Sequence, residues 1–333
     1  MRSIIRRAAC AGLLATGLAL PAMAQEPWKM ASAAQPGSVL VTMIEEIIAT
    51  TNANIDGKAA IERQFVGNEQ EMWQQLIRGR LQMGASSPSG GAVSVPDGLV
   101  VSLPYLWSSD AERVYVTDKY ALPLMRAMYA EKGVHLLLMA DVGWNDVVCK
   151  TACLTPASVK GMKIRVAPTV ASKMFWQALG ANGVQLPLSE AWPGLEQNLV
   201  SGADLPFLFY ITTPAAQSAP HYVHTRHLHH PAVFIANKAL WDKLPAETRA
   251  KIEKALPTPA KFRKMVDDDE KVKIEEFRKK GGFVHELNDA QRAEWRKLVE
   301  PALPELVKTM GPRAQELFEA IQKGKAEFAA MKK

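Results

Sequence analysis

The feature that most restricts the fold of this sequence is the alternation of short apolar strands with amphipathic helices near its beginning. From residue 29 to residue 85 the pattern predicts strand, helix, strand, helix and strand in turn, with apolar side chains at helical spacing over 38–49. This order is typical of an α/β domain with a mostly parallel sheet. The serine-, glycine- and proline-rich loop 86–98 follows the third strand, and open α/β sheets bind ligands at such loops.

A second α/β run begins after a gap and predicts a second lobe. Strands are expected at 134–140 and 147–149, followed by a strand at 161–166 that leads into a helix at 170–179. A long, highly charged helix is expected over 262–280, where two glycines end it, and it is a candidate to bridge the lobes. The chain of 333 residues is long enough for two ordinary domains.

The first 25 residues have the layout of an export signal. Arginines at positions 2, 6 and 7 precede the uncharged run 8–20, and an Ala-x-Ala cleavage site ends at Ala24. The apolar run is too short to span a bilayer of about 30 Å as a lasting helix, so a retained anchor is only the alternative. The sequence therefore predicts a signal peptide over residues 1–24 and a periplasmic protein that begins near Gln25.

The positive charge of the chain does not indicate a nucleic-acid partner. The formal net charge is +6, and the three arginines of the signal segment supply half of it. The remaining charge of about +3, spread over a chain of this length, forms no basic footprint. Nucleic acid is therefore not expected among the partners.

Export changes how the cysteines are interpreted. Removal of Cys10 with the signal leaves Cys149 and Cys153, separated by three residues. In an oxidising compartment an isolated close pair predicts a disulfide that fixes a local turn. Two free thiols remain the main alternative, and a redox-active centre is less compatible because the spacing is not Cys-x-x-Cys.

Motifs of enzyme chemistry are missing from the sequence. It contains no nucleophile elbow, phosphate-binding P-loop, dinucleotide-binding glycine turn or His-Glu-x-x-His zinc helix. The sequence therefore predicts a protein that is not an enzyme and that uses no cofactor. An exported enzyme stays open as an alternative, because aspartates and glutamates are plentiful enough to supply an acid–base pair.

Histidines crowd into one short segment. Five of the seven lie between His221 and His230, and neutral imidazole is the commonest metal ligand. A metal-binding receptor that uses His224, His227 and His229 is therefore an alternative. The competing interpretation is a polar loop with partly exposed histidines that runs into a strand at 232–236, since strand alternation separates His230 from His227 and His229.

Arg165 lies inside an apolar strand, between Ile164 and Val166. A buried guanidinium needs an anion or a dense set of acceptors, and its planar fork suits bidentate binding of a carboxylate. A strand-edge arginine paired with a neighbouring acid or with water is the alternative.

Longer runs around Arg165 carry a family resemblance. Residues 159–166 read Val-Lys-Gly-Met-Lys-Ile-Arg-Val and residues 178–190 read Ala-Leu-Gly-Ala-Asn-Gly-Val-Gln-Leu-Pro-Leu-Ser-Glu. These runs, with further matches in order at 67–84, 103–107 and 237–245, resemble the periplasmic solute-binding proteins of tripartite ATP-independent periplasmic (TRAP) transporters, of the dicarboxylate-binding DctP type. The resemblance extends over nearly the whole mature chain.

The resemblance implies an α/β periplasmic binding protein of two lobes, a Venus-flytrap, with a mixed, mostly parallel sheet in each lobe and a long bridging helix. Lobe I would comprise residues 25–142 and about 231–270. Lobe II would comprise residues 143–230 and about 271–333, with the bridging and C-terminal helices. The family binds small organic acids by lobe closure and delivers them to a permease, so the implied partners are a carboxylate ligand and the small and large membrane subunits of a TRAP permease.

The resemblance also assigns positions in the ligand site. Arg165 matches the arginine that clamps the ligand carboxylate, and Ser86 with its neighbours matches the loop of lobe I that lines the cleft. Asn145 lies where some members carry a second arginine, and Leu205 lies where the family commonly has an asparagine. Trp192 replaces the usual tyrosine after Ser-Glu.

These departures leave one strong anion contact and a more apolar wall. We therefore expect a monocarboxylate with an apolar or aromatic body rather than a dicarboxylate or a sugar acid. Trp144, Leu188 and Phe207 are the candidate wall residues, and for each aromatic side chain packing in the core is an equal alternative.

Overall fold

The computed structural model describes residues 27–55 and 60–331. The predicted signal peptide and its cleavage site lie outside the described residues. Within those residues the chain forms a single nine-stranded sheet. Its strands are β1 (Trp28–Ser32), β2 (Ile61–Phe65), β3 (Met83–Ser86), β4 (Val134–Cys149), β5 (Lys163–Val166), β6 (Asn182–Gln185), β7 (Gly202–Pro206), β8 (His221–Asn237) and β9 (Phe283–Glu286).

The sheet is parallel at its two sides and antiparallel in the middle. Its order is β2-β1-β3-β8-β4-β7-β5-β6, with β9 paired to β8. Strands β1, β2 and β3 pair in parallel at one side, and β5, β6 and β7 do so at the other. Strands β3, β8, β4 and β7 join these sides through antiparallel pairs. The mixed α/β fold class predicted from the sequence is confirmed.

The structure differs from the prediction in having one sheet that runs through both lobes instead of a separate sheet in each. The segments 134–140 and 147–149, expected as two strands, are one strand, β4, which pairs with β8 along almost its whole length. The register shifts between Asp141 and Gly143 and again between Asn145 and Val147. Bulges of this kind let a strand bend without ending. The first of them includes Gly143, whose φ of 112° is a backbone conformation that glycine adopts readily.

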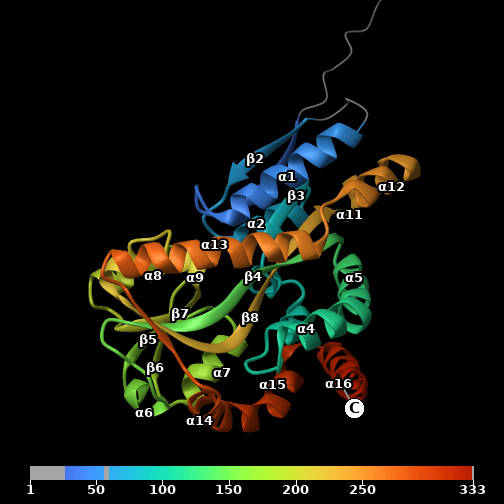
Figure 1. The fold of residues 1–333 in the computed structure, drawn as a ribbon. Helices are drawn as coiled ribbons and strands as arrows, with labels where there is room; N and C mark the ends of the chain where they lie inside the picture. Colours follow the sequence, from blue (N-terminus) through green and yellow to red (C-terminus); the bar gives the residue numbers. More distant parts are fainter. Residues whose placement is uncertain (1–26, 56–59, 332–333) are drawn as a thin grey trace, which may run out of the picture.

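Helices cover both faces of this sheet (Figure 1). The α-helices are α1 (Val39–Asn54), α2 (Glu69–Ile77), α3 (Pro88–Gly91), α4 (Asp110–Val116), α5 (Leu122–Glu131), α6 (Pro156–Val159), α7 (Val170–Ala178), α8 (Leu188–Glu196), α9 (Phe207–Tyr210), α10 (Ala215–Ser218), α11 (Lys238–Asp242), α12 (Ala246–Ala255), α13 (Pro259–Lys279), α14 (Asp289–Val299), α15 (Leu303–Met310) and α16 (Ala314–Ala330). Shorter turns are η1 (Pro96–Ser102), η2 (Thr117–Ala121) and η3 (Glu300–Ala302). No helix in the described part of the chain has the length and apolar character needed to cross a bilayer.

Helix α13 is the expected long bridging helix, and Figure 1 shows it lying across the molecule. Near its start Phe262 packs on Phe234 of β8, with ring centroids 5.9 Å apart. Near its end Phe277 packs on Phe207, with centroids 6.0 Å apart. All four rings belong to one continuous apolar cluster, so the helix is anchored in it near both of its ends.

The C-terminal helix α16 packs against the segment 96–121. Its Ile321 and Leu317 share an apolar cluster with Val116 and Leu99. At Gly324 an added Cβ would lie 2.7 Å from the Tyr120 ring, so this glycine allows a close approach of the helix. The sequence assigned α16 to lobe II and 96–121 to lobe I; that division of the chain stays a prediction.

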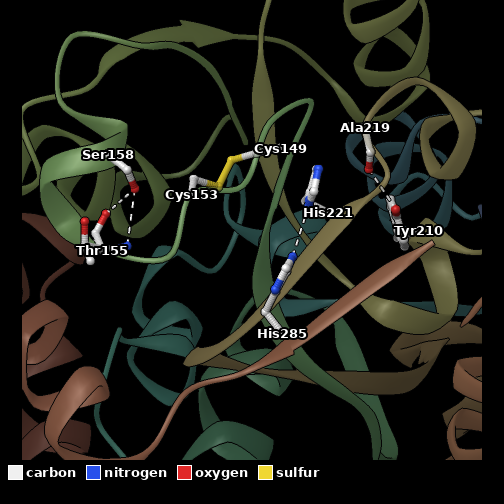
Figure 2. Close-up of a disulfide and its surroundings, with 8 residues drawn as sticks. All are labelled: Cys149, Cys153, Thr155, Ser158, Tyr210, Ala219, His221 and His285. Atoms are coloured by element: carbon white, nitrogen blue, oxygen red, sulfur yellow. Dashed lines mark hydrogen bonds between the residues drawn. A yellow bond between two sulfur atoms is a disulfide. The ribbon is translucent and has the colours of Figure 1, made fainter. Parts of the chain in front are cut away.

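The structure joins Cys149 and Cys153 in a disulfide with a Cα–Cα distance of 6.4 Å (Figure 2). It closes the turn that follows β4, and both cysteines are buried. Beyond it, Thr155 and Ser158 form a capping box at the start of α6. The disulfide thus fixes the exit of β4 from the sheet, next to the short helix that leads toward β5.

Candidate ligand site

A cavity opens beside the middle of the sheet and includes residues from both halves of the molecule. Its empty space is about 800 Å³, counting the part open to solvent. One side is formed by Ala33, residues 67–70, Ser87 and Ser89. The other side is formed by residues of β4, β5, β7 and β8 and by the segments 167–169 and 187–188, with Phe209. A small molecule held there would contact both sides at once.

Arg165 lines this cavity from β5 and is 4% exposed. Its Nε donates to the backbone oxygen of Leu186 at 3.0 Å, which fixes the plane of the guanidinium. Among the described residues its two Nη atoms have no hydrogen-bond acceptor, and no carboxylate lies within 4.0 Å. Burial lowers the pKa of Arg165, and the charge of Asp204 opposes that shift. The side chain is a desolvated cation whose fork of donors remains free.

Asp204, at the centre of β7, is the counter-charge of this site and is almost completely buried. Its carboxylate accepts from Trp176 Nε1 at 2.8 Å and from Asn145 Nδ2 at 2.9 Å, and Ser172 Oγ lies at 3.3 Å. Burial would raise the pKa of Asp204, but the neighbouring His227 imidazole, the charge of Arg165 and the hydrogen bond from Trp176 hold it below its usual range. Asp204 is therefore ionised at neutral pH and accepts only.

Asn145 lines the cavity from β4 and is 8% exposed. Its Nδ2 is committed to Asp204. Its Oδ1 is buried and has no hydrogen-bond partner among the described residues. A buried acceptor without a donor is uncommon in folded proteins, which makes this oxygen a candidate contact for a ligand.

The opposite wall contains Glu69, a carboxyl group that sequence reasoning did not single out. Asn68 caps α2 and places Glu69 in its first turn. The Glu69 carboxylate accepts from Ser87, from the backbone N–H at 3.0 Å and from Oγ at 2.6 Å. Burial raises the pKa of Glu69, and the bonds from Ser87 oppose that shift.

The structure places Ser87 in the cavity, whereas Ser86 lies behind it. The Ser86 hydroxyl accepts from Trp73 Nε1 at 2.9 Å and is buried. The prediction named Ser86 with its neighbours. Strand alternation turns Ser86 toward helix α2 and leaves Ser87 on the cavity side.

Leu188, a candidate wall residue, and Leu205, which replaces the family's usual asparagine, both line the cavity. Phe207 does not: it packs in the core against Tyr210, Tyr222 and Phe277. The chain turns into α9 directly after Pro206, and it is Phe209 that faces the cavity. Because of this helical turn, Phe209 lines the cavity in place of the predicted Phe207.

Trp144 also lies outside the cavity. It precedes Asn145 on β4, so alternation directs its side chain to the other face of the sheet. There it packs edge-on against His229, with centroids 5.4 Å apart, and lines a separate groove with Arg226.

The histidine segment is a buried strand, not the polar, partly exposed loop that the sequence suggested. It belongs to β8, which pairs with β4 and β9, and His224, His227 and His229 are each at most 4% exposed. Each points toward a different carboxylate, of Asp146 at 2.9 Å, Asp204 at 3.6 Å and Asp141 at 3.5 Å in that order. Among the described residues no group of three or more histidine, cysteine or acidic side chains is arranged to hold a metal.

His230, which follows this set on β8, lines the cavity. Burial lowers its pKa to about 4, the Arg165 charge adds to that effect, and Asp204 opposes it. The imidazole is therefore neutral at pH 7 and adds no second positive charge beside Arg165.

The chain matches the family profile described as bacterial extracellular solute-binding protein, family 7 (DctP), over residues 30–309. It is 26% identical over 280 residues to the C4-dicarboxylate-binding periplasmic protein DctP of Rhodobacter capsulatus, covering 83% of each chain. It is 25% identical to the 2,3-diketo-L-gulonate-binding periplasmic protein YiaO of Escherichia coli strain K12, covering 77% of this chain and 78% of that protein.

Solved structures show the same fold. The TRAP periplasmic solute-binding protein of Roseobacter denitrificans, with bound β-D-glucuronate, superposes with a TM-score of 0.82 at 22% identity. The match covers 90% of this chain and 99% of that one. The corresponding protein of Sulfurospirillum deleyianum, with bound succinate, gives a TM-score of 0.80 at 22% identity and the same coverage.

These matches agree with the geometry of the cavity. The free guanidinium of Arg165 suits the binding of an acid, and binding alone needs no nucleophile or base. The two-lobed fold and the solute-binding proteins named above support a receptor. The chain belongs to family 7 of the bacterial extracellular solute-binding proteins, the family of periplasmic TRAP receptors to which its sequence pointed, and it is a solute-binding receptor, not an enzyme.

Proposed function

We propose that this protein is an extracytoplasmic receptor for a small organic acid with one carboxylate and an apolar or aromatic body. The observation that carries the proposal is Arg165, a buried cation that lines the cavity and whose two Nη atoms have no acceptor among the residues that the structure describes. A carboxylate fits the two parallel donors of a guanidinium, and such a bidentate pair is strong where water is excluded.

The charges of the cavity favour a single carboxylate. Among the described residues that line it, Arg165 is the only arginine or lysine, and His230 is neutral at pH 7. A second carboxylate would find the ionised Asp204 and the acceptor oxygens of Glu69 as its neighbours. Since like charges at close range repel, we expect a dicarboxylate to bind more weakly than a monocarboxylate of the same length.

The rest of the wall suits an apolar body. Leucine, proline, alanine and phenylalanine side chains supply much of the surface on the Arg165 side, and they include Leu188, Leu205, Phe209 and Leu228. Transfer of apolar ligand surface from water to such a wall contributes about 25 cal/mol per Å². This contribution adds to the carboxylate contact without a further polar group.

Binding would proceed by closure of the two sides of the cavity around the ligand. Closure expels water, which strengthens the Arg165–carboxylate pair, and the closed state gains population only because the ligand binds it better. The closed protein would then deliver the acid to the small and large membrane subunits of a TRAP permease, as the family membership supports.

Thermal-shift and calorimetric titration of the protein from Gln25 onward, against a panel of carboxylates, tests this proposal. A ligand that binds only the folded state raises the melting temperature by mass action. Arg165→Ala should weaken binding by about 2–5 kcal/mol, the scale for removing one partner of a buried charge pair. Arg165→Lys should recover only part of this loss, because an ammonium group lacks the planar fork.

Arg80→Ala is the matched control, because Arg80 is exposed and outside the cavity. It should leave affinity unchanged. Equal affinity of the wild type and Arg165→Ala for the same acid would rule out the proposed clamp. A panel of divalent metals run in parallel covers the histidine alternative, and stabilisation by zinc or copper without any response to acids would contradict the proposal.

A further inference from the structure

We infer that Asn145 selects acids that carry a hydrogen-bond donor close to the carboxylate, a hydroxyl or amino group that donates to its free Oδ1. This inference rests on the proposed function, because it assigns the ligand class of the same cavity. It concerns the part of the ligand next to the carboxylate and leaves the apolar body unchanged.

The orientation of the Asn145 amide is fixed by Asp204. An ionised carboxylate only accepts, so the amide nitrogen must face it, and Nδ2 lies 2.9 Å from Asp204 Oδ2. The other Asp204 oxygen is taken by Trp176 and Ser172. A flip of the amide would bring its oxygen against the carboxylate, which repulsion forbids.

The oxygen that remains is an acceptor without a donor. Asn145 is 8% exposed, and its Oδ1 is buried and unpartnered among the described residues although the residue lines the cavity. Buried polar atoms are almost always paired in folded proteins, so a missing donor is expected from the molecule that fills the cavity.

The sheet brings this acceptor near the carboxylate site. Strand β7 lies between β4 and β5, with Asn145 paired to Pro206 on one side and Ile164 paired to Gly202 on the other. Neighbouring strands are about 4.8 Å apart, so β4 with Asn145 and β5 with Arg165 lie on the two sides of β7, which carries Asp204. Both side chains also line the same cavity, so one small acid can contact Arg165 through its carboxylate and Asn145 through a nearby donor.

This arrangement predicts which close analogues are rejected. An acid without the donor leaves Oδ1 unpaired, and a 2-oxo acid points an acceptor at an acceptor. A site built around a hydrogen bond discriminates strongly against an analogue that cannot make it. We expect 2-hydroxy or 2-amino acids to bind at least about tenfold more tightly than their unsubstituted and 2-oxo counterparts.

The experiment is calorimetric titration of the wild-type protein with four acids that differ only at carbon 2. The 4-methylpentanoate and 3-phenylpropanoate series, each as 2-hydroxy, 2-amino, unsubstituted and 2-oxo acid, supply two apolar bodies. The hydroxy and amino arms also identify which donor the site takes. This comparison needs no variant, so it does not depend on the folding of any mutant.

Asn145→Ala then tests the assignment to this side chain. The preference for the substituted acid should fall to less than about threefold, mainly because the substituted acid binds less tightly. Trp176→Phe is the matched control, since it removes another donor to Asp204 from outside the cavity while leaving Oδ1 in place. Its preference should match that of the wild type, with folding of both variants checked by circular dichroism.

The outcomes separate this inference from the function on which it rests. Equal affinity for all four acids, with binding still lost in Arg165→Ala, would overturn the donor assignment and leave the carboxylate receptor standing. Preserved preference in a folded Asn145→Ala protein would overturn the role of Asn145. Failure of every acid to bind, or binding that survives Arg165→Ala, would refute the proposed function and this inference with it.

Discussion

At the scale of single residues, the site is organised around two buried opposite charges that do not touch. In the described part of the chain Arg165 has no carboxylate within 4.0 Å, yet Asp204 on the next strand lowers the cost of burying its positive charge. Because Asp204 is already saturated with donors from Trp176 and Asn145, it compensates the charge without occupying the fork of Arg165. The guanidinium therefore stays available to a ligand.

Asp204→Asn should destabilise the fold strongly. The substitution removes the compensating charge and turns one of the two acceptor oxygens into a donor that faces other donors. We expect the free energy of unfolding to fall by about 3 kcal/mol, the scale for breaking a buried charged network. Urea denaturation followed by circular dichroism measures it.

Asp289→Asn is the control for this prediction, since the Asp289 side chain is fully exposed at the start of α14. It should change stability by less than about 0.5 kcal/mol. A loss below about 1 kcal/mol in Asp204→Asn would show that Asp204 does not stabilise the buried cation.

Sequence reasoning identified Arg165 because a cation in an apolar strand stands out, and family resemblance added Asn145, Leu188 and Leu205, which line the cavity. It did not identify Asp204 or Glu69, since acidic residues are too common for one to stand out. Phe207, Trp144 and Ser86 fell outside the cavity for a shared reason. The face that a side chain takes depends on where strands bend and helices start, and a shift of one residue reverses it.

At the scale of elements, the two long strands β4 and β8 carry features that the local pattern does not reveal. The segments 134–140 and 147–149 each have the pattern of a short strand, and only pairing with β8 joins them across the bulges. His224 and His229 of β8 look polar in sequence but are buried, because β4 and β9 supply carboxylate partners from distant segments. Pairing between segments about 80 residues apart cannot be read from local periodicity.

Glu270 of helix α13 lines a groove together with Asp146 of β4 and His224 of β8. Its pKa is raised there from 4.5 to about 7. Burial is the main cause, the charge of Asp146 adds to it, and His224 and Arg226 oppose it. The folded protein therefore keeps a proton on Glu270 that the unfolded chain has already released. The stability that this group contributes is present below about pH 4.5 and is lost as the pH rises through about 7.

Glu270→Gln should remove this pH dependence. At pH 5 the variant should be more stable by only about 1 kcal/mol or less, because Glu270 is still protonated in the folded wild type and has only begun to ionise in the unfolded chain. At pH 8 the variant should be more stable by about 2–3 kcal/mol, since the wild type then bears a partly buried charge. Urea denaturation at pH 5, 6, 7 and 8 measures the difference.

The exposed Glu275 of the same helix gives the matched variant Glu275→Gln, whose effect should be small at every pH. A difference in the free energy of unfolding between Glu270→Gln and the wild type that stays constant from pH 5 to 8 would contradict the raised pKa of Glu270.

At the scale of the whole molecule, the cavity lies where two sides of the protein meet, and only a few elements connect these sides. Strands β4 and β8 and helix α13 run from one side to the other (Figure 1). Composition and resemblance predicted the two-lobed α/β class, which the fold confirms, but one sheet through both lobes depends on long-range pairing. Bulges in β4 at Asp141–Gly143 and Asn145–Val147 are the natural positions for bending.

Ligand binding should make the protein more compact. If the two sides close on the acid, small-angle X-ray scattering should give a smaller radius of gyration at saturating ligand than without it. Arg165→Ala at the same ligand concentration should keep the larger value. An unchanged radius of gyration in a wild-type sample that calorimetry shows to be saturated would contradict closure.

The central claim is that a carboxylate binds to Arg165 inside the cavity. The most direct measurement is a crystal structure of the protein from Gln25 onward with the tightest acid from the titrations. We predict that both carboxylate oxygens lie about 2.7–2.9 Å from the nitrogens of the Arg165 guanidinium, with the apolar body against Leu188 and Phe209. A ligand whose carboxylate lies elsewhere, while Arg165 contacts only protein or solvent, would contradict the account.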